Sequence, residues 1–321
     1  MKDTDYAYAV ARVRGNETRL LTENELSAAV AAPDFESAAL RLREKGYEIG
    51  READIAPALG RKLADAWALI EEILPDPSAF DPLIIGGDFH NLKVLLKALV
   101  GQRDPAGLYM RPSVYDPEAI RSAVFARKNE DLPEPLRHAE RSAYRILTKT
   151  RSAQLADAVV DRASLEWSIA LAKQRAEAAV LSLAETRAAL ADLKILRRCV
   201  RAGKSRSFVY RSVCACAAFD RDGLADVSQE PAGVGALVAA SPLAALVPSL
   251  QESDIAFEKA CDEFETASLR GAKWQAFGIE PLLAYYSAVE TEVRNVRILL
   301  CGKRTGLTEA EIRERMRRLY A

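Results

Sequence analysis

Residues 88–95 read DFHNLKVL, and related stretches follow at 192–196 (DLKIL) and 292–299 (EVRNVRIL). The aligned positions Asn91, Asp192 and Asn295 stand 101 and 103 residues apart. Solenoid repeats have periods of about 20–50 residues, so this much longer interval argues against a stacked array. The motif therefore predicts three similar lobes in one chain, related by pseudo-threefold symmetry.

On a helix, positions i, i+3 and i+7 share one face. Asp88, Asn91 and Leu95 occupy them in the first copy, and the third copy repeats the arrangement from Glu292. The second copy differs from the other two, because Ala189 stands at the position that Asp88 and Glu292 occupy. The polar side chains predict hydrogen bonds to neighbouring elements that fix the packing within each lobe. The residues given this packing role are Asp88, Asn91, Asp192, Glu292 and Asn295.

A different face of each copy is basic. One interpretation is an ordinary solvated surface, and the other is that the three basic faces meet a shared partner at the centre. Both alternatives remain open at this point. The residues concerned are Lys93, Lys97, Lys194, Arg198, Arg294 and Arg297.

The rest of the chain reads as helix, which predicts an all-α fold. Thr22 and Glu25 form a capping box, and Asp34 can cap the next helix. Residues 136–202 contain no Gly or Pro and are rich in helix formers, which predicts two or three long antiparallel helices. The possible breaks between these helices are Ser152, Asp157 and Asp161.

Gly- and Pro-rich stretches follow the first and second motif copies, at 101–112 and 203–231. They place the approximate lobe boundaries, so we predict lobes at 1–105, 106–206 and 207–321. The N- and C-terminal segments can also pack together in this arrangement.

Composition and motifs argue against several function classes. The 45 basic and 46 acidic residues nearly cancel, which disfavours a general nucleic-acid binder. A local cluster could still bind phosphate, although a solvated helix end explains it more simply; its members are Arg197, Arg198, Arg201, Lys204, Arg206 and Arg211. No phosphate-binding loop of the GxxxxGK[ST] type and no catalytic set emerges. We expect no catalytic residue, cofactor or metal site.

The five cysteines lack a disulfide spacing and fit reduced thiols in the cytoplasm. Cys214 and Cys216 are the only close pair, and we expect them in a packed core rather than on zinc. The polar, acidic N-terminus does not resemble a secretory signal, and no segment has the ~20 consecutive apolar residues of a membrane span.

Matches spread over the whole chain resemble the C subunits of bacterial and archaeal V/A-type ATPases, whose eukaryotic counterpart is the d subunit of the vacuolar proton pump. They comprise YAYAVARVR at 6–14, LLT at 20–22, Gly46-Tyr47, 88–93, Glu292, NVR at 295–297, Gly302-Lys303, Gly306-Leu307, EIRER at 311–315 and Tyr320-Ala321.

This resemblance implies an all-helical funnel of three lobes that acts as a non-catalytic rotor part. Its wide ends would rest on the cytoplasmic face of the membrane rotor ring, as a peripheral part of the complex. Its cavity would receive the central stalk during ATP-driven ion transport or ATP synthesis, with the six basic residues facing the stalk. The implied partners are the proteins of the stalk and ring, with no nucleic acid, and the isolated chain would be monomeric. The alternative is a helical adaptor or tether unrelated to a rotary ATPase.

Overall fold

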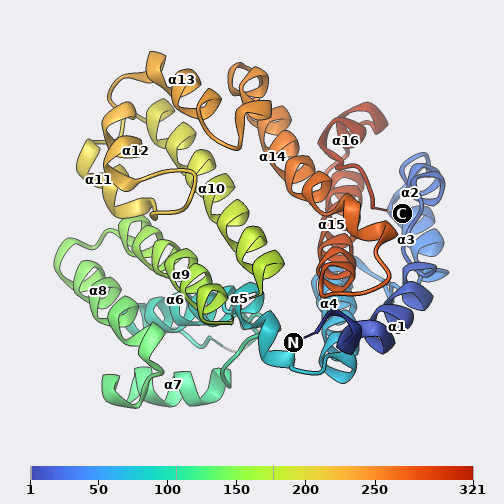
Figure 1. Ribbon diagram of the computed structural model, residues 1–321, viewed down its shortest axis with the longest axis horizontal. Helices are drawn as coiled ribbons and strands as arrows, with labels where there is room; N and C mark the ends of the chain where they lie inside the picture. Colours follow the sequence, from blue (N-terminus) through green and yellow to red (C-terminus); the bar gives the residue numbers. More distant parts are fainter. Residues whose placement is uncertain (1, 106, 176, 321) are drawn as a thin grey trace. The chain divides into compact units, whose positions relative to one another are not determined.

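The computed structural model describes residues 2–105, 107–175 and 177–320. Over these ranges the secondary structure consists of helices, with no strand, so the all-α prediction is confirmed (Figure 1). The chain divides into two compact units, which are described separately. We call Met1–Pro77 with Gln251–Ala321 the terminal unit and Ser78–Leu250 the middle unit.

The terminal unit contains helices from both ends of the sequence. They are α1 (Ala7–Glu17), α2 (Glu23–Val30), α3 (Phe35–Arg43), α4 (Ile55–Ile73), α14 (Asp254–Ser268), α15 (Glu280–Arg304) and α16 (Glu309–Arg315), with 3-10 turns η1 (Asp3–Tyr6), η2 (Glu52–Asp54) and η8 (Arg270–Trp274). Its centre is α15, which contacts α1, α3, α4, α14 and α16. Most residues of α15 are buried, so this helix forms the core of the unit.

The middle unit is built around the longest Gly- and Pro-free stretch of the chain. Its helices are α5 (Asp81–Ile84), α6 (Gly86–Gly101), α7 (Pro117–Phe125), α8 (Glu134–Thr150), α9 (Ala153–Arg175), α10 (Ala178–Arg201), α11 (Arg206–Ser212), α12 (Arg221–Val227) and α13 (Val234–Ala239). The 3-10 turns η4 (Asn129–Asp131), η5 (Pro231–Gly233) and η6 (Ala244–Leu246) join them, while η3 (Pro77–Phe80) and η7 (Pro248–Gln251) lie at its ends. Helix α9 contacts α5, α6, α8, α10 and α11.

The structure confirms the predicted helix starts and one of the three predicted breaks. Thr22 and Glu25 form the capping box of α2, and Asp34 caps α3 by accepting from the Ser37 N–H. The stretch 136–202 lies in three helices, α8, α9 and α10. The first break falls at Arg151–Ser152, whereas Asp157 and Asp161 lie inside α9, so these two predicted breaks are wrong.

All three motif helices end in the same way. Gln102, Gly203 and Gly306 have φ angles of 50°, 58° and 74°, in the left-handed region. Each stands eleven residues after the motif Asn or Asp. In each case the next residue donates its N–H to the carbonyl five residues before it, which is a Schellman-type stop; the donors are Arg103, Lys204 and Leu307 and the acceptors Ala98, Cys199 and Gly302. The repeat thus extends from the motif to the end of its helix.

The three-lobe division with boundaries at 105/106 and 206/207 stays a prediction. The two contact units have their boundaries at 77/78 and 250/251. One such unit can contain more than one lobe, because neighbouring bundles that share a helix surface cluster together. The funnel arrangement likewise stays a prediction.

A close backbone approach explains one glycine of the first motif helix. A Cβ added to Gly87 would collide with the backbone carbonyl of Pro112, in the loop that returns to α6. A side chain at this position would therefore push the loop away from the helix.

We predict that Gly87→Ala lowers the free energy of unfolding by about 1–3 kcal/mol, as overpacking does in other proteins. Gly60→Ala is the matched control, because Gly60 is an exposed helical glycine of α4 with open space around its Cβ position. It should raise the free energy of unfolding by about 0.5–1 kcal/mol through helix propensity. Urea denaturation measures both, and equal signs would contradict the close-approach argument.

Candidate functional site

The candidate site comprises the polar and basic faces of α6, α10 and α15. Asp88, Asn91, Asp192, Glu292 and Asn295 are each no more than 1% exposed. Buried polar groups need hydrogen-bond partners, so their contacts define what these faces do.

In the first copy, the buried side chains hold the segment that follows α6. Asn91 forms a reciprocal pair with Met110: the Asn91 Nδ2 donates to the Met110 carbonyl at 3.1 Å, and the Met110 N–H donates to Asn91 Oδ1 at 2.7 Å. One turn earlier, the Asp88 carboxylate accepts from the backbone N–H groups of Val114 and Tyr115, at 2.8 and 3.0 Å. The returning segment is therefore fixed to α6 at two points.

The third copy uses the same reciprocal pair. Asn295 Nδ2 donates to the Arg317 carbonyl at 2.8 Å, and the Arg317 N–H donates to Asn295 Oδ1 at 2.9 Å. Arg317 follows α16, so this contact joins the C-terminal segment to the middle of α15. The amide of Asn suits this role because it offers one acceptor and donors on the same planar group.

Glu292 joins α15 to the N-terminal part of the chain. Its carboxylate accepts from the Leu21 N–H at 2.6 Å and the Tyr47 hydroxyl at 2.7 Å. The Lys62 ammonium lies 3.6 Å away and supplies the opposite charge. Because these partners come from residues 21, 47 and 62, one buried carboxylate ties α15 to three separate segments of the terminal unit.

The second copy reaches a similar result with different chemistry. Asp192 accepts from the Cys214 N–H at 3.0 Å and from the Cys214 Sγ at 3.3 Å. A carboxylate lacks the N–H donors of Asn, and here the thiol provides the second contact. Ala189 offers no carboxylate, but Glu185, one turn earlier on the same face of α10, accepts from the Ala217 N–H at 2.6 Å. Glu185 is a residue that sequence reasoning missed.

We call the contacts of Asn91 with Met110, Asp192 with Cys214 and Asn295 with Arg317 the return clamps. The clamped residues stand 19, 22 and 22 positions after the motif residue. The second and third copies place a short helix before the clamp, α11 and α16, whereas the described residues between α6 and Met110 in the first copy form no helix. No sequence feature marked Met110, Cys214 or Arg317 as the partner of a motif residue, although the equal offset in the second and third copies is a signal that could have found Cys214 and Arg317.

Burial changes the acid–base chemistry of these groups. Desolvation raises the pKa of Asp88 to about 6, although the Val114 and Tyr115 N–H groups oppose the shift. Desolvation raises the pKa of Asp192 to about 7, against the hydrogen bonds from Cys214. Burial, and then the neighbouring Asp192, raise the pKa of the Cys214 thiol. Cys214 is thus a buried thiol, as expected, whereas Cys216 is only partly buried.

Lys93, Lys97 and Arg294 of the predicted basic face make ion pairs within their own units. Lys93 Nζ lies 2.5 Å from Asp161 Oδ1, and Lys97 Nζ lies 2.7 Å from Asp157 Oδ2. Both carboxylates are on α9, which explains why these Asp residues stand inside a helix. In the terminal unit, Arg294 pairs with Asp262 of α14 at 3.0 Å. These three side chains therefore contribute less net positive charge than the sequence suggested.

The other three basic residues differ in exposure. Lys194 is partly buried, and Arg198 and Arg297 are exposed. The structure places Lys194 and Arg198 on α10 of the middle unit and Arg297 on α15 of the terminal unit. Among the described residues, Arg297 has no ion-pair partner within 4.0 Å. The basic face is therefore divided between the two units. Arg294 and Arg297 lie in the terminal unit, and the four other residues lie in the middle unit.

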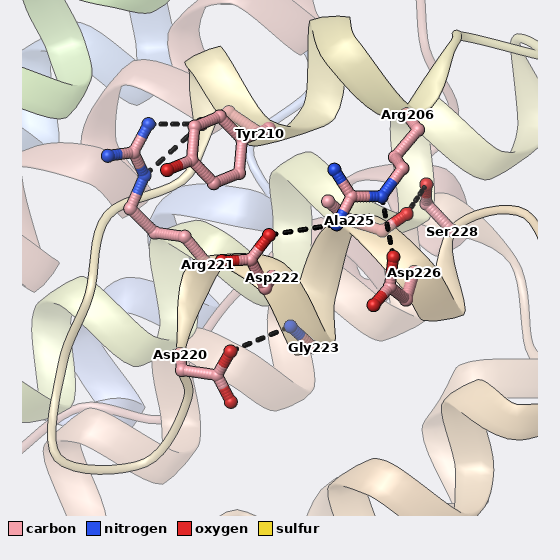
Figure 2. A network of polar contacts seen from close by, with 9 residues as sticks. All are labelled: Arg206, Tyr210, Asp220, Arg221, Asp222, Gly223, Ala225, Asp226 and Ser228. Atoms are coloured by element: carbon pink, nitrogen blue, oxygen red, sulfur yellow. Dashed lines mark hydrogen bonds and ion pairs between the residues drawn. The ribbon is translucent and has the colours of Figure 1, made fainter.

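The basic cluster near α11 is partly neutralised by α12. Arg206 contacts Asp226 at 2.5 Å and Asp222 at 2.8 Å, while Arg221 donates to the Tyr210 carbonyl and lies over the Tyr210 ring (Figure 2). The acidic residues of α12 therefore reduce the charge that a phosphate backbone would meet, which weakens the nucleic-acid alternative.

Neither a metal centre nor a membrane span is found in the part of the chain that the structure describes. No group of three or more His, Cys, Asp or Glu side chains there could hold a metal ion. No described helix is long and apolar enough to cross a membrane. The terminal unit has a cavity of about 610 Å³, whose lining includes three basic residues, Arg19, Lys45 and Lys62, and two acidic residues, Glu44 and Asp65.

Comparison with known proteins identifies the family. The sequence model described as "ATP synthase (C/AC39) subunit" matches residues 9–315, which is nearly the whole chain. The chain belongs to this family. It is also similar to the C subunit of the V-type sodium ATPase of Enterococcus hirae, with 23% identity over 317 residues that cover 96% of this chain and 97% of the relative. The resemblance to the C subunits of V/A-type ATPases is thereby confirmed.

The family places the polar and basic faces in one subunit of a rotary ATPase. Because the family match covers residues 9–315, it includes all three motif helices and the clamped residues Met110 and Cys214, whereas the clamped Arg317 lies just beyond it. The residues that act as contacts to the other proteins of the complex remain a proposal.

We predict that Asn295→Ala lowers the free energy of unfolding by about 2–4 kcal/mol, because it leaves the N–H and carbonyl of Arg317 without their partner. Limited proteolysis should also cut the segment after α16 faster. Arg297→Ala, on the exposed face of the same helix, is the matched control and should change stability by less than about 0.5 kcal/mol. Similar values for the two variants would contradict the clamp.

We predict that Asp192→Asn raises the free energy of unfolding at about pH 8, by on the order of 1–3 kcal/mol, since an amide has no charge to desolvate. Because the pKa of Asp192 is raised to about 7, the folded state binds the proton more tightly than the unfolded state does. The contribution of Asp192 to stability therefore increases as the pH falls from about 7 towards 4.

The stability difference between Asp192→Asn and the parent chain should consequently shrink between about pH 8 and pH 5 in urea titrations. Asp157→Asn, on the partly exposed end of an ion pair, controls for a general effect of charge removal. A difference that stays constant with pH would show that Asp192 is ionised throughout.

Proposed function

We propose that this chain is the non-catalytic central-rotor socket of a V/A-type ATPase, coupling the soluble central stalk to the membrane rotor ring. The family match over residues 9–315 carries the proposal. The coupling would serve ATP-driven ion transport or ATP synthesis, with the nucleotide chemistry elsewhere in the complex.

The return clamps support this role mechanically. A part that transmits torque must keep its helices from sliding along one another under load. Interiors are close-packed, and a buried reciprocal hydrogen bond adds a directional restraint that apolar contacts lack. The return clamps on α6 and α15 are reciprocal, and in the clamp on α10 Asp192 accepts both hydrogen bonds; together they would hold each returning segment in one register as the load changes.

The basic face is proposed as the contact surface for the stalk or ring. The six residues are Lys93, Lys97, Lys194, Arg198, Arg294 and Arg297. Lys97, Arg198, Arg294 and Arg297 are exposed, and we choose Arg198 and Arg297 for the test because they lie on motif helices of different units. Lys93, Lys97 and Arg294 would contribute more by orienting helices through their ion pairs than by meeting a partner.

The proposed location is the cytoplasmic side of the membrane, where the chain would be a peripheral member of the complex with the stalk and ring proteins as partners. In isolation it would be a monomer, because one socket serves one central axis. Family membership favours this role over a helical adaptor unrelated to a rotary ATPase.

Purification from the native host tests the proposal. A tagged chain should be recovered from gently solubilised membranes together with the stalk and ring proteins of the ATPase, as identified by mass spectrometry. Recovery alone, or with unrelated proteins, would overturn the socket role and favour the adaptor.

We further predict that the double charge reversal Arg198→Glu with Arg297→Glu weakens stalk binding at least tenfold, while the thermal unfolding curve is unchanged. The reason is that an exposed charge steers and holds an oppositely charged partner, whereas contacts of exposed charges within their own fold contribute little to stability. Isothermal titration with the purified stalk proteins measures the effect.

The matched control reverses two other exposed arginines, Arg51→Glu with Arg103→Glu, again one in each unit. It has the same net charge but leaves the motif helices intact. Equal weakening by both double variants would show that net charge, and not the basic face, determines binding.

A further inference from the structure

One loop of the terminal unit exposes two aromatic side chains to solvent. Trp274 is 86% exposed and Phe277 is 52% exposed, and Trp274 has the highest exposure of any large hydrophobic side chain among the described residues. Both lie between α14 and α15, in the segment 270–277 that begins with η8. We call this segment the η8 loop. Large apolar side chains held in water usually mark a contact surface.

The backbone of the η8 loop is fixed to the rest of the unit. Arg14 of α1 donates to the carbonyls of Ala272 and Gln275, at 2.7 and 3.0 Å. Ala272 is 4% exposed and anchors the turn, and the Gly278 N–H donates to the Asp3 carbonyl at 3.1 Å. The aromatic exposure is therefore a property of a held loop, and ordering it on binding would cost little conformational entropy.

The charge of the loop indicates the kind of surface it fits. Arg270 and Lys273 are exposed, and no acidic residue occurs between Leu269 and Ile279. Tryptophan favours the interface between lipid headgroups and hydrocarbon, and basic side chains are attracted to anionic headgroups. A short loop with two aromatic and two basic side chains combines both preferences.

We propose that the η8 loop binds an anionic lipid surface, with Trp274 and Phe277 at the headgroup level and Arg270 and Lys273 on the phosphates. This contact would be additional to the protein contacts of the socket. It rests on the proposed function, which brings the chain next to a membrane, but its test needs only the isolated chain and lipid.

The experiment is co-sedimentation of the full chain with vesicles of phosphatidylcholine and phosphatidylglycerol, compared with phosphatidylcholine alone. We expect binding to the anionic vesicles, weakened by added salt. Trp274→Ser with Phe277→Ser should reduce the partition coefficient at least tenfold, on the order of the loss expected for two interfacial aromatics. Leu40→Ser is the matched control, since Leu40 is a 59% exposed apolar residue of α3 in the same unit.

Quenching by brominated lipid reports the depth of Trp274 directly. The parent chain should be quenched on anionic vesicles, whereas Trp274→Phe should still bind and lose most of the quenching. Circular dichroism checks that the fold is retained, which we expect because both aromatic side chains are exposed.

Three results would overturn the lipid proposal. They are no binding to anionic vesicles, equal binding by the loop variant, or quenching that persists in Trp274→Phe. If the loop variant lost the ring or stalk proteins in purification while vesicle binding was absent, the loop would be a protein contact. The proposed socket would then stand and the lipid inference would fail, so the two outcomes are distinguishable.

Discussion

The structure depends on buried polar side chains that hold backbone from a distant part of the sequence. The main-chain hydrogen bonds of an all-helical chain lie within its helices, and apolar contacts are not directional, so these interactions leave some freedom in the register of neighbouring elements. Asn91, Asp192 and Asn295 remove this freedom by binding backbone groups 19 to 22 residues ahead. Glu292 does the same for the N-terminal part of the chain. Burying these polar groups costs desolvation free energy, and this cost is offset only when each group finds its hydrogen-bond partner. Only one register of the helix and the returning segment provides all the partners.

Sequence reasoning predicted the class of fold and the polar faces better than their partners. The caps at Thr22 and Asp34 were found because capping uses residues three positions apart. Met110, Cys214 and Arg317 were not found, because a backbone N–H carries no side-chain signature. Glu185 replaces the carboxylate that Ala189 lacks, one helical turn away, and a strict alignment of motif positions hides it. Asp157 and Asp161 suggested breaks but serve as partners for the lysines of α6.

The second copy shows how a repeat can diverge while its geometry persists. Asp192 and the Cys214 thiol replace the amide pair of the other copies, and the cost is a carboxyl whose pKa is raised by burial. The left-handed residue that ends the helix, Gly203, stands eleven residues after the motif residue, as Gln102 and Gly306 do in the other copies. Backbone geometry therefore survives where side-chain chemistry changes. This persistence is consistent with the rotor-socket role proposed above.

The measurement that tests the rotor-socket account most directly is the coupling of ATP hydrolysis to ion movement in membrane vesicles from the native host. Removing this chain should leave ATP hydrolysis but abolish ATP-driven ion transport, because the stalk would turn without turning the ring. Adding back the purified chain should restore transport. Ion transport that continues at its normal rate without the chain would contradict the account.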